Sequence, residues 1–307
     1  MIHDLIIIGA GPAGITVGIY ASRLGLKTLL ITKGFGGQVS DKAVSINNYP
    51  GFSSISGQGL VEEMKKHLKS LPVDIQIDEA VSLEKKEDNF VVLTKGGKKY
   101  ESVCAVIASG AKAKHLNIPG EEEFAGRGVS YCGICDGPVF KNKIIAVIGG
   151  GNAGFETAIF LSDIAKKIYI LEFSDEPGAF EENQKIVKSS GKAEVIVNAE
   201  AKEIKGDKFV TSLVYKDKKT EEEKILEVDG VFVQAGYVPA VSFVKNLVDF
   251  NEKGEIKTDF ETMKTKTPGL FAAGDVIACQ FKQIISSAGD GAKAALAAHN
   301  YIKHKRL

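Results

Sequence analysis

The sequence predicts an α/β protein made of two doubly wound units, the second inserted into the first. Two glycine-rich turns at residues 9–14 and 149–154 carry this prediction, because each stands between an apolar run and a helical stretch. Other strand-like segments come after each turn and would add a further sheet to each unit. We therefore expect two Rossmann-like domains of the three-layer ββα type.

Composition and charge exclude several classes of function. The chain has 307 residues, of which 44% are apolar and 25% charged, as in soluble globular proteins. Its 39 basic and 39 acidic side chains balance, so no basic field favours a nucleic-acid partner. No apolar run approaches the ~18 residues of a membrane span, and the first strand begins too early to leave room for a signal peptide. We expect a cytoplasmic protein.

The first unit opens the chain. Residues 5–8 are an apolar run without alternation, which is typical of a strand buried on both faces of a parallel sheet. A helix is predicted from Pro12 to about Leu24, where Gly25 ends it, and a second buried strand comes next at 27–32. Together these segments form one βαβ unit.

The first glycine turn has the residues that a dinucleotide needs. Gly9 permits the tight turn, Gly11 lets the backbone approach a pyrophosphate, and Gly14 lets the helix pack on the strand. A glycine-rich turn without a ligand is the alternative. No acidic residue closes the second strand, where Thr32 and Lys33 stand, so a ribose must be bound differently here.

The second unit repeats the plan, with a strand at 144–148, a helix at about 154–165 and a strand at 167–172. Antiparallel strands are expected between and after the two units. Their expected positions are 73–93 and 98–107, separated by the turn at 95–97, and 194–204, 209–215 and 224–233, with a hairpin tip at 216–224.

Glu172 closes the second strand of this unit. A carboxylate at that position can accept hydrogen bonds from a ribose 2′-hydroxyl and would repel a 2′-phosphate. The next residues, 173–177, are acidic and contain no Arg. We therefore expect NADH to be preferred over NADPH, although Glu172 could also simply end a strand in solvent.

The second unit has two candidate boundaries. Pro119 and Gly120 precede it and residues 236–239 come after it, and both segments resemble hinges. The predicted domains are therefore 1–114 together with 243–307, and an insert at 115–242.

Cys132 and Cys135 lie inside this insert. A zinc site is disfavoured, because zinc needs about four ligands and the other cysteines and the histidines are scattered, so we expect no metal. The pair could be inert, but it borders a predicted turn, and its spacing favours redox disulfide exchange. Asp136 could be the proton donor and acceptor, or a turn-forming residue. Cys104 and Cys279 are expected to be small buried residues.

The C-terminal part adds one more candidate. Residues 271–275 predict a buried strand that ends in Gly274 and Asp275, where a carboxylate can bind a sugar or ribityl hydroxyl at the carboxyl edge of a sheet. Residues 282–284 precede a helix of small residues, expected at about 286–303, whose N-terminus could face electron-rich flavin atoms.

These segments together closely resemble the low-molecular-weight thioredoxin reductase family of FAD-dependent pyridine nucleotide-disulfide oxidoreductases. The matching signatures are at residues 9–14, 36–38, 48–51, 131–137, 149–154 and 271–275. Within the family, residues 135–141, 149–154, 171–173 and 282–284 look like the flavin part of the alkyl hydroperoxide reductase flavoprotein subunit. That branch uses NADH, and the His-Arg-Arg stretch of NADPH-linked members is missing here.

The resemblance implies that FAD binds the outer domain and NADH the insert. The expected cofactor-binding residues are Gly9, Gly11, Pro12, Ala13, Gly14, Gly36, Gly37, Gln38, Asn48, Gly110, Gly274, Asp275, Lys282, Gln283 and Ile284 for FAD, and Gly149, Gly151, Asn152, Ala153, Gly154 and Glu172 for NADH.

The resemblance also implies a mechanism. Electrons would pass from NADH through the flavin to a disulfide between Cys132 and Cys135, with Cys135 nearer the flavin, Cys132 attacking the partner and Asp136 as acid and base. One domain would rotate on the other between the two steps. A homodimer is the family habit.

The expected partner is a separate thioredoxin- or glutaredoxin-like protein, because this chain lacks the thioredoxin-like N-terminal segment of the alkyl hydroperoxide reductase flavoprotein. Three alternatives stay open. The final acceptor could be a peroxiredoxin system reached through such a carrier, the donor could be ferredoxin, or the protein could be a flavin- and NADH-binding redox sensor without turnover.

Overall fold

A computed structural model describes residues 2–42, 46, 48–244 and 246–305, without the side chains of Asp41, Lys42, Ile134 and Cys135. The chain forms two compact units. Unit 1 comprises Met1–Lys112 and Val238–Leu307, and unit 2 comprises Ala113–Tyr237. Each unit has its own sheets and hydrophobic core.

The sheet of unit 1 is mixed. In spatial order its path runs β3 (Val73–Ile77), β2 (Thr28–Phe35), β1 (Ile2–Ala10), β6 (Lys99–Ile107), β5 (Asn89–Thr94) and β4 (Ala80–Lys86), with β17 (Leu270–Ala272) also on β6. The pairings of β3, β2, β1, β6 and β17 are parallel, whereas β4, β5 and β6 pair antiparallel. The carboxyl ends of the parallel strands therefore share one edge.

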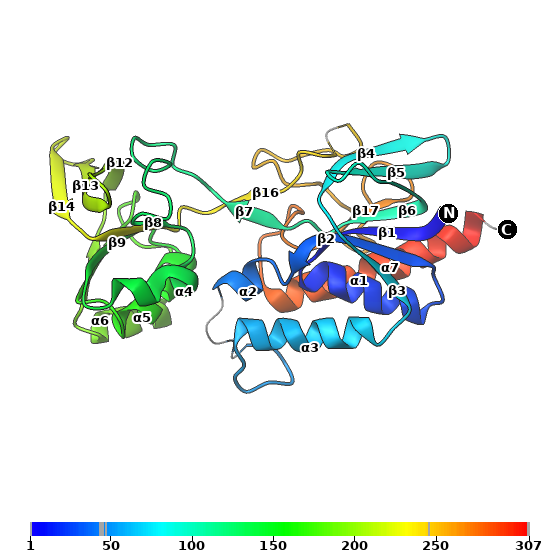
Figure 1. Cartoon of the computed structure of the whole chain (residues 1–307), viewed down its shortest axis with the longest axis horizontal. Helices are drawn as coiled ribbons and strands as arrows, with labels where there is room; N and C mark the ends of the chain where they lie inside the picture. The colour runs from blue at the N-terminus through cyan, green and yellow to red at the C-terminus, as the bar shows by residue number, and fades with distance from the viewer. Residues whose placement is uncertain (1, 43–45, 47, 245, 306–307) are drawn as a thin grey trace. The chain divides into compact units, whose positions relative to one another are not determined.

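Helices cover one face of the parallel strands, and β4 and β5 lie on the other side (Figure 1). The helices of unit 1 are α1 (Pro12–Arg23), α2 (Gln38–Lys42), α3 (Gly57–Lys69) and α7 (Ile284–Lys305). The central residues of β1 are fully buried, as a strand with helices on one side and a further strand layer on the other requires. Helix α7 packs closely on α1, since a Cβ on Gly291 would lie 2.3 Å from the carbonyl oxygen of Ala13.

Unit 2 has the same three layers. Its parallel sheet has the order β11 (Ala193–Ile196), β10 (Lys167–Leu171), β9 (Ile144–Ile148), β15 (Gly230–Val233) and β8 (Val129–Ser130). An antiparallel sheet of β12 (Ala199–Gly206), β13 (Val210–Asp217) and β14 (Glu223–Glu227) lies on one side, and α4 (Gly133–Asp136), α5 (Asn152–Ser162) and α6 (Glu181–Ser189) lie on the other (Figure 1). The predicted fold class is confirmed.

Three expected antiparallel segments are wrong in part. The segment 73–93 contains β3, which pairs parallel with β2. The segment 194–204 breaks at Asn198, whose φ is +53°, into parallel β11 and antiparallel β12. The segment 224–233 likewise divides into β14 and parallel β15. Half-exposed edge strands such as β3 alternate in polarity whichever way they pair, so the pattern alone cannot give the direction.

The insert begins two residues and ends five residues earlier than expected. The chain crosses between the units at 112/113 and 237/238, whereas the expected crossings were at 114/115 and 242/243. Pro119 and Gly120 lie within unit 2, where the Pro119 carbonyl accepts a hydrogen bond from the Ile204 amide at 2.9 Å. A Cβ on Gly120 would lie 1.9 Å from the Ile204 carbonyl oxygen, so this dipeptide is a packed turn.

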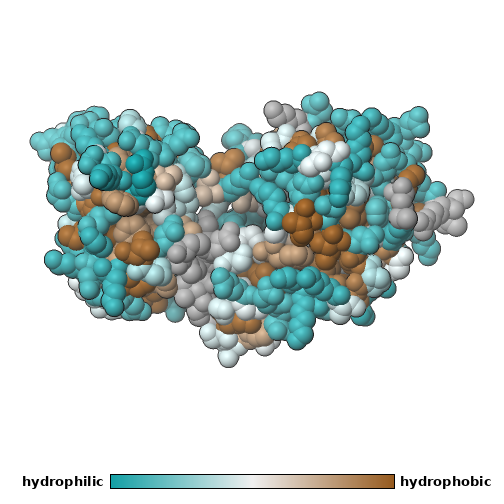
Figure 2. All heavy atoms as spheres, in the orientation of Figure 1, coloured by the Kyte–Doolittle hydropathy of each residue, from teal (hydrophilic) through white to brown (hydrophobic). Residues whose placement is uncertain are grey.

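The surfaces of the two units are mainly hydrophilic on the face shown in Figure 2, with hydrophobic residues scattered among them. Within the described residues, no helix is both long enough and apolar enough to cross a bilayer.

Candidate cofactor and redox sites

The glycine turn of unit 1 joins β1 to α1. Gly9 has a φ of +110°, and a Cβ there would lie 2.3 Å from the Ala108 carbonyl oxygen. A Cβ on Gly14 would lie 1.9 Å from the Gly9 carbonyl oxygen. In contrast, nothing lies within 4 Å of a Cβ on Gly11, which precedes α1 without a side-chain cap. The first amides of α1 are thus left for a bound anion, and the residues fit a dinucleotide pyrophosphate.

The other expected residues of unit 1 lie just beyond the carboxyl ends of neighbouring strands, where open α/β sheets bind their ligands. Residues 36–38 come after β2, Gly110 after β6, and Gly274 and Asp275 after β17. The Gly36 amide donates to the Ala10 carbonyl at 2.8 Å and so fastens the end of β2 to the glycine turn. The sheet therefore brings these segments to one edge.

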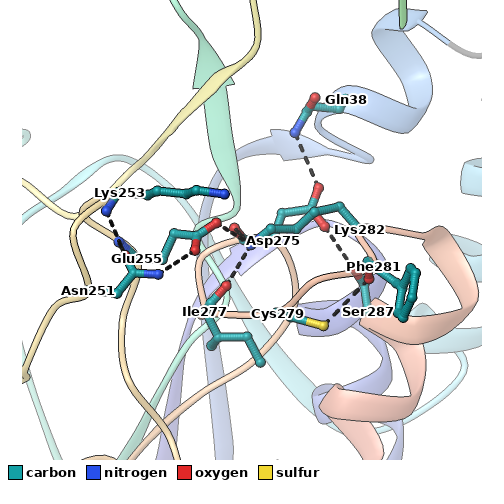
Figure 3. A network of polar contacts seen from close by, with 10 residues as sticks. All are labelled: Gln38, Asn251, Lys253, Glu255, Asp275, Ile277, Cys279, Phe281, Lys282 and Ser287. Carbon is teal, nitrogen blue, oxygen red and sulfur yellow. Dashed lines mark hydrogen bonds and ion pairs between the residues drawn. The ribbon is translucent and has the colours of Figure 1, made fainter. Parts of the chain in front are cut away.

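Asp275 stands at the centre of a polar network at this edge (Figure 3). Its two carboxylate oxygens accept hydrogen bonds from Gln38 Nε2 at 3.3 Å and Ser287 Oγ at 3.2 Å. Burial raises the pKa of Asp275, while Ser287 and Lys282 act in the opposite direction. A partly buried carboxylate held by the neutral donors Gln38 and Ser287 suits binding to a ligand hydroxyl, which can share its charge without neutralising it.

Lys282 has a structural role in the same network. Its ammonium contacts the Asp275 and Ile277 carbonyls at 3.0 and 2.5 Å and pairs with Glu255 Oε1 at 2.9 Å. These contacts use all three of its N–H donors, so Lys282 fixes the loop that carries Asp275. Burial opposes ionisation of Glu255, but Lys282 and Asn251 outweigh it and lower the pKa of that carboxyl. Glu255 is a residue that the sequence did not single out.

The remaining expected residues of this unit lie close by. Asn48 Nδ2 donates to Gln283 Oε1 at 3.4 Å. Ile284 is the first residue of α7, which begins two residues earlier than expected. Pro12 and Ala13 open α1, where proline costs nothing because the first amides have no intrahelical partner.

The glycine turn of unit 2 has the same geometry. Gly149 has a φ of +118°, and a Cβ there would lie 2.3 Å from the Gln234 carbonyl oxygen. A Cβ on Gly154 would lie 1.8 Å from the Gly149 carbonyl oxygen, while Gly151 has open space and precedes α5 without a side-chain cap. This second helix start fits a second pyrophosphate.

Asn152 and Ala153 open α5, and Asn152 Oδ1 accepts a hydrogen bond from the Phe180 amide at 2.7 Å. This contact holds the segment after β10 against the start of the helix. Asn152 therefore has a local structural role as well as its expected place beside a nucleotide.

Glu172 is bound to the backbone on both sides. Its Oε2 accepts the Gly150 amide and its Oε1 the Ser174 amide, each at 2.7 Å. Each carboxylate oxygen can accept a further hydrogen bond, so a ribose hydroxyl remains a feasible partner. The contacts give the carboxylate a fixed direction beside the glycine turn.

A cation that local sequence did not reveal lies next to this residue. Lys218 Nζ is 3.5 Å from the centre of the Phe173 ring and donates to the Phe173 carbonyl at 3.2 Å. It comes from the turn between β13 and β14, 45 residues away, so no local motif could predict it. The segment after Glu172 is therefore less uniformly acidic than its own sequence indicates.

The two cysteines of the insert come after β8. The residues from Gly133 to Asp136 form α4 and a 3-10 turn (Gly137–Phe140) continues it, so the expected turn is in fact helical. Gly133 packs on α5, since a Cβ there would lie 2.8 Å from Thr157 Cγ2. The side chain of Cys135 lies outside the described residues, so its pairing with Cys132 stays a prediction.

Ser130 contacts both the cysteine segment and Asp136. Its hydroxyl lies 2.6 Å from Asp136 Oδ2 and accepts a hydrogen bond from the Cys132 amide at 3.0 Å. Sequence reasoning missed this residue, because no spacing rule links a strand-end serine to a carboxylate beyond a short helix.

Tyr131 fastens the other side of the segment. Its hydroxyl donates to Glu121 Oε1 at 2.8 Å and lies 2.9 Å from His115 Nδ1. Burial raises the pKa of Tyr131, and the Glu121 carboxylate raises it further. Glu121 itself is only 2% exposed, and it accepts the Leu116 and Asn117 amides.

The other two cysteines differ from each other. Cys104 is fully buried, as expected, and burial raises the pKa of its thiol to about 12. Cys279 is only partly buried, which corrects the expectation, and its Sγ lies 3.6 Å from the Phe281 carbonyl oxygen (Figure 3). Among the described residues, no group of three or more His, Cys, Asp or Glu could hold a metal ion.

Known proteins resemble the chain over almost its whole length. It is 42% identical over 300 residues to a protein named NADH dehydrogenase from Bacillus subtilis, and 40% identical over 301 residues to the F subunit of alkyl hydroperoxide reductase from Staphylococcus aureus. These alignments cover 97% and 98% of the chain but 58% and 59% of the relatives. The chain thus spans less than two thirds of their length.

Solved structures agree. The thioredoxin reductase of Lactococcus lactis matches with a TM-score of 0.95 at 38% identity, over 98% of this chain and 99% of that one. The thioredoxin reductase of T. acidophilum matches with a TM-score of 0.91 at 38% identity, over 97% and 98%. The pattern of the pyridine nucleotide-disulphide oxidoreductase family matches residues 3–295. The resemblance seen in the sequence is confirmed, and the chain belongs to the pyridine nucleotide-disulphide oxidoreductase family.

Proposed function

We propose that the protein is a FAD-dependent disulfide reductase of the thioredoxin reductase type. It passes electrons from NADH through FAD and a disulfide between Cys132 and Cys135 to the disulfide of a separate thioredoxin- or glutaredoxin-like protein. One observation carries the proposal: the cysteine segment packs through Gly133 on α5, the helix that the second glycine turn begins. A redox-capable segment thus shares a unit with a nucleotide site.

Unit 1 would hold FAD. The open start of α1 at Gly11 suits the pyrophosphate, and Asp275, oriented by Gln38 and Ser287, suits a hydroxyl of the cofactor. When bound, FAD would supply two-electron redox chemistry between a nicotinamide and a disulfide. The protein's part is to hold it, since Gly9 and Gly14 let β1 and α1 approach closely enough for the turn to close on it.

Unit 2 would hold NADH. Glu172 is held by the Gly150 and Ser174 amides, so its carboxylate would meet a 2′-phosphate without freedom to move away. This favours NADH over NADPH. Lys218 lies on Phe173 and already donates to that residue's carbonyl, so we expect it to reduce the discrimination rather than to reverse it.

The two cysteines carry the thiol chemistry. When the disulfide is reduced, its S–S bond takes up an electron pair and breaks, and two protons complete the thiols. Asp136 would exchange one of these protons with a sulfur. Cys132 would then attack the partner's disulfide as a thiolate, and Cys135 would displace the partner as the internal S–S bond forms again. The partner gains the electron pair and both protons.

Two properties of the assembly belong to this proposal as well. We expect a homodimer in the cytoplasm.

A second candidate acceptor is a peroxiredoxin system reached through the carrier protein, and similarity to the F subunit of alkyl hydroperoxide reductase favours it. Ferredoxin is a weaker candidate donor, because the glycine turn at 149–154 keeps the open helix start that a nucleotide needs.

The test is a stopped-flow assay with NADH, NADPH and reduced ferredoxin, run against thioredoxin-fold proteins of the host. We expect NADH to bleach the flavin of the wild type, with reduction of a partner as the next step. Cys132→Ser should keep the bleaching and lose partner reduction, while Cys279→Ser, a matched control at a free cysteine, should keep both. Partner reduction that survives Cys132→Ser would refute the proposal, and bleaching without any thiol-dependent turnover would favour a sensor.

A further inference from the structure

Ser130 is the last residue of β8 and is fixed by the parallel sheet of unit 2. It pairs with Phe232 on β15, and only 4% of its surface is exposed. Asp136, in contrast, is exposed at the end of the four-residue α4. A rigid buried hydroxyl therefore contacts the carboxylate of an exposed residue.

The Ser130 hydroxyl has one proton and two acceptor positions. Two acceptors lie within its reach, Asp136 Oδ2 at 2.6 Å and the Cys132 carbonyl at 3.1 Å. The shorter contact to a carboxylate is the stronger, so the hydroxyl donates to Asp136. Its oxygen accepts the Cys132 amide at 3.0 Å. One side chain thus joins the first cysteine to the carboxylate.

The backbone alone holds Asp136 weakly. Its amide donates to the Cys132 carbonyl at 3.3 Å, and α4 is a single turn. A single α-helical turn continued only by a 3-10 turn has little helical stability of its own, so it needs outside contacts to keep its side chains in place. Ser130 provides such a contact from a strand.

We propose that Ser130 is the positioning residue that gives the Asp136 carboxylate the direction needed to exchange a proton with a sulfur of the cysteine segment. This inference rests on the proposed function, in which Asp136 exchanges a proton with a sulfur. In that step the S–S bond breaks, the electron pair arrives from NADH by way of the flavin, and a proton passes from Asp136 to one sulfur. Asp136 regains its proton from solvent, so Ser130 is chemically unchanged and acts only through the carboxylate.

The test is a double-mutant cycle of Ser130→Ala and Asp136→Ala in the full-length, FAD-loaded protein. The measured quantity is the rate at which the NADH-reduced flavin passes electrons to the disulfide. Ser130→Ala alone should slow this step about tenfold, because misplacing a reacting group costs rate steeply. Added to Asp136→Ala, it should slow the step less than about threefold, because its target is gone. Flavin reduction by NADH should not change.

Ser102→Ala is the matched control. Ser102 is fully buried on β6, and its hydroxyl donates to the Cys104 carbonyl at 2.7 Å, two residues on, rather than to a carboxylate. If this variant slows electron transfer to the disulfide as much as Ser130→Ala does, loss of a buried serine is enough and the proposal fails. Equal slowing by Ser130→Ala with and without Asp136 would also overturn it.

A second readout separates this inference from the proposed function. The protein is reduced chemically, and the rate at which iodoacetamide alkylates Cys132 is measured by peptide mass, without NADH or a partner. We expect both single variants to change this rate in the same direction and the double variant to match Asp136→Ala. If NADH turnover is absent but this pattern holds, the proposed function fails and the Ser130 assignment stands. No effect of either single variant would refute the assignment.

Discussion

The two glycine turns of this chain are nearly copies of each other in geometry, although they belong to different units. Their first glycines, Gly9 and Gly149, have φ values of +110° and +118°, and a Cβ on either would lie 2.3 Å from a backbone carbonyl oxygen. A Cβ on Gly14 or Gly154 would lie 1.9 or 1.8 Å from the carbonyl oxygen of the first glycine. Steric contacts of the backbone therefore give the glycine turn, which would bind a pyrophosphate, the same geometry in both units.

The two units differ in the residues at and beyond the end of their second strands. In unit 2 Glu172 binds the Gly150 amide and points its carboxylate at the turn. In unit 1 Thr32 occupies that place, and its hydroxyl donates to the Gly34 carbonyl at 2.6 Å. The chain then continues to Gln38, which reaches Asp275. The shared turn would thus make each unit a dinucleotide site, and the residues beyond it would decide which dinucleotide fits.

The largest effect should come from replacing the last glycine of each turn, which lets the helix pack closely on the strand. Gly14→Ala and Gly154→Ala each force a Cβ into a backbone oxygen, which should cost roughly 3 kcal/mol in stability. Gly14→Ala should purify without FAD, whereas Gly154→Ala should keep FAD and lose reduction by NADH. Visible absorption and NADH bleaching measure both.

Gly11→Ala and Gly151→Ala are the matched controls, because a Cβ there meets nothing within 4 Å. They should leave the unfolding free energy of the cofactor-free protein unchanged. Each should weaken only the binding of the cofactor of its own unit, about tenfold. If either variant weakened the binding of the other unit's cofactor by the same factor, the two sites would not be separate.

A smaller effect is expected from Glu172→Gln. Gln offers one acceptor where Glu172 offers two, so one amide of the Gly150 and Ser174 pair is left unpaired. We expect kcat/KM for NADH to fall about tenfold and that for NADPH to fall less, with FAD content unchanged. An unchanged ratio of the two would show that Glu172 does not select the nucleotide.

Asp275→Asn should change how the stability of the cofactor-free protein depends on pH. Burial raises the pKa of Asp275 in the folded protein. A raised folded-state pKa gives stability at low pH that is lost as the pH rises through that pKa. The cofactor-free Asn variant should therefore gain stability relative to wild type between about pH 4 and pH 7. Urea unfolding at both values measures this difference, and a constant difference would contradict the prediction.

The smallest effect concerns the fully buried thiol of unit 1, that of Cys104. Burial raises the pKa of Cys104 to about 12, so it should stay unreacted with iodoacetamide near pH 8 while Cys132 reacts in the reduced protein. Peptide masses after a timed reaction measure both. Alkylation of Cys104 at the rate of Cys132 in folded protein would show that burial does not protect it.

Much of the fold could be predicted, because a βαβ unit with a glycine turn is a local signal. The apolar runs of β1 and β9 and the turns next to them lie within about 15 residues. The direction of β3, β11 and β15 could not be predicted, since it depends on which distant strand each one joins. The same runs of residues would fit either direction.

In the candidate sites, too, only the residues with a local sequence signal could be predicted. Glycines, the cysteine pair, Glu172 and Asp275 stand in recognisable local settings. The residues that orient them do not, because Lys218 reaches Phe173 from a separate hairpin and Glu255 reaches Lys282 from a separate loop. Contacts of this kind are made only when the chain folds.

The most direct measurement is an anaerobic titration of the FAD-loaded protein with NADH, monitored by flavin absorption. If electrons pass from one unit's flavin to the other unit's disulfide, wild type should take up about two equivalents of NADH and Cys132→Ser about one, because flavin and disulfide each accept an electron pair. Equal uptake by both proteins would contradict the account.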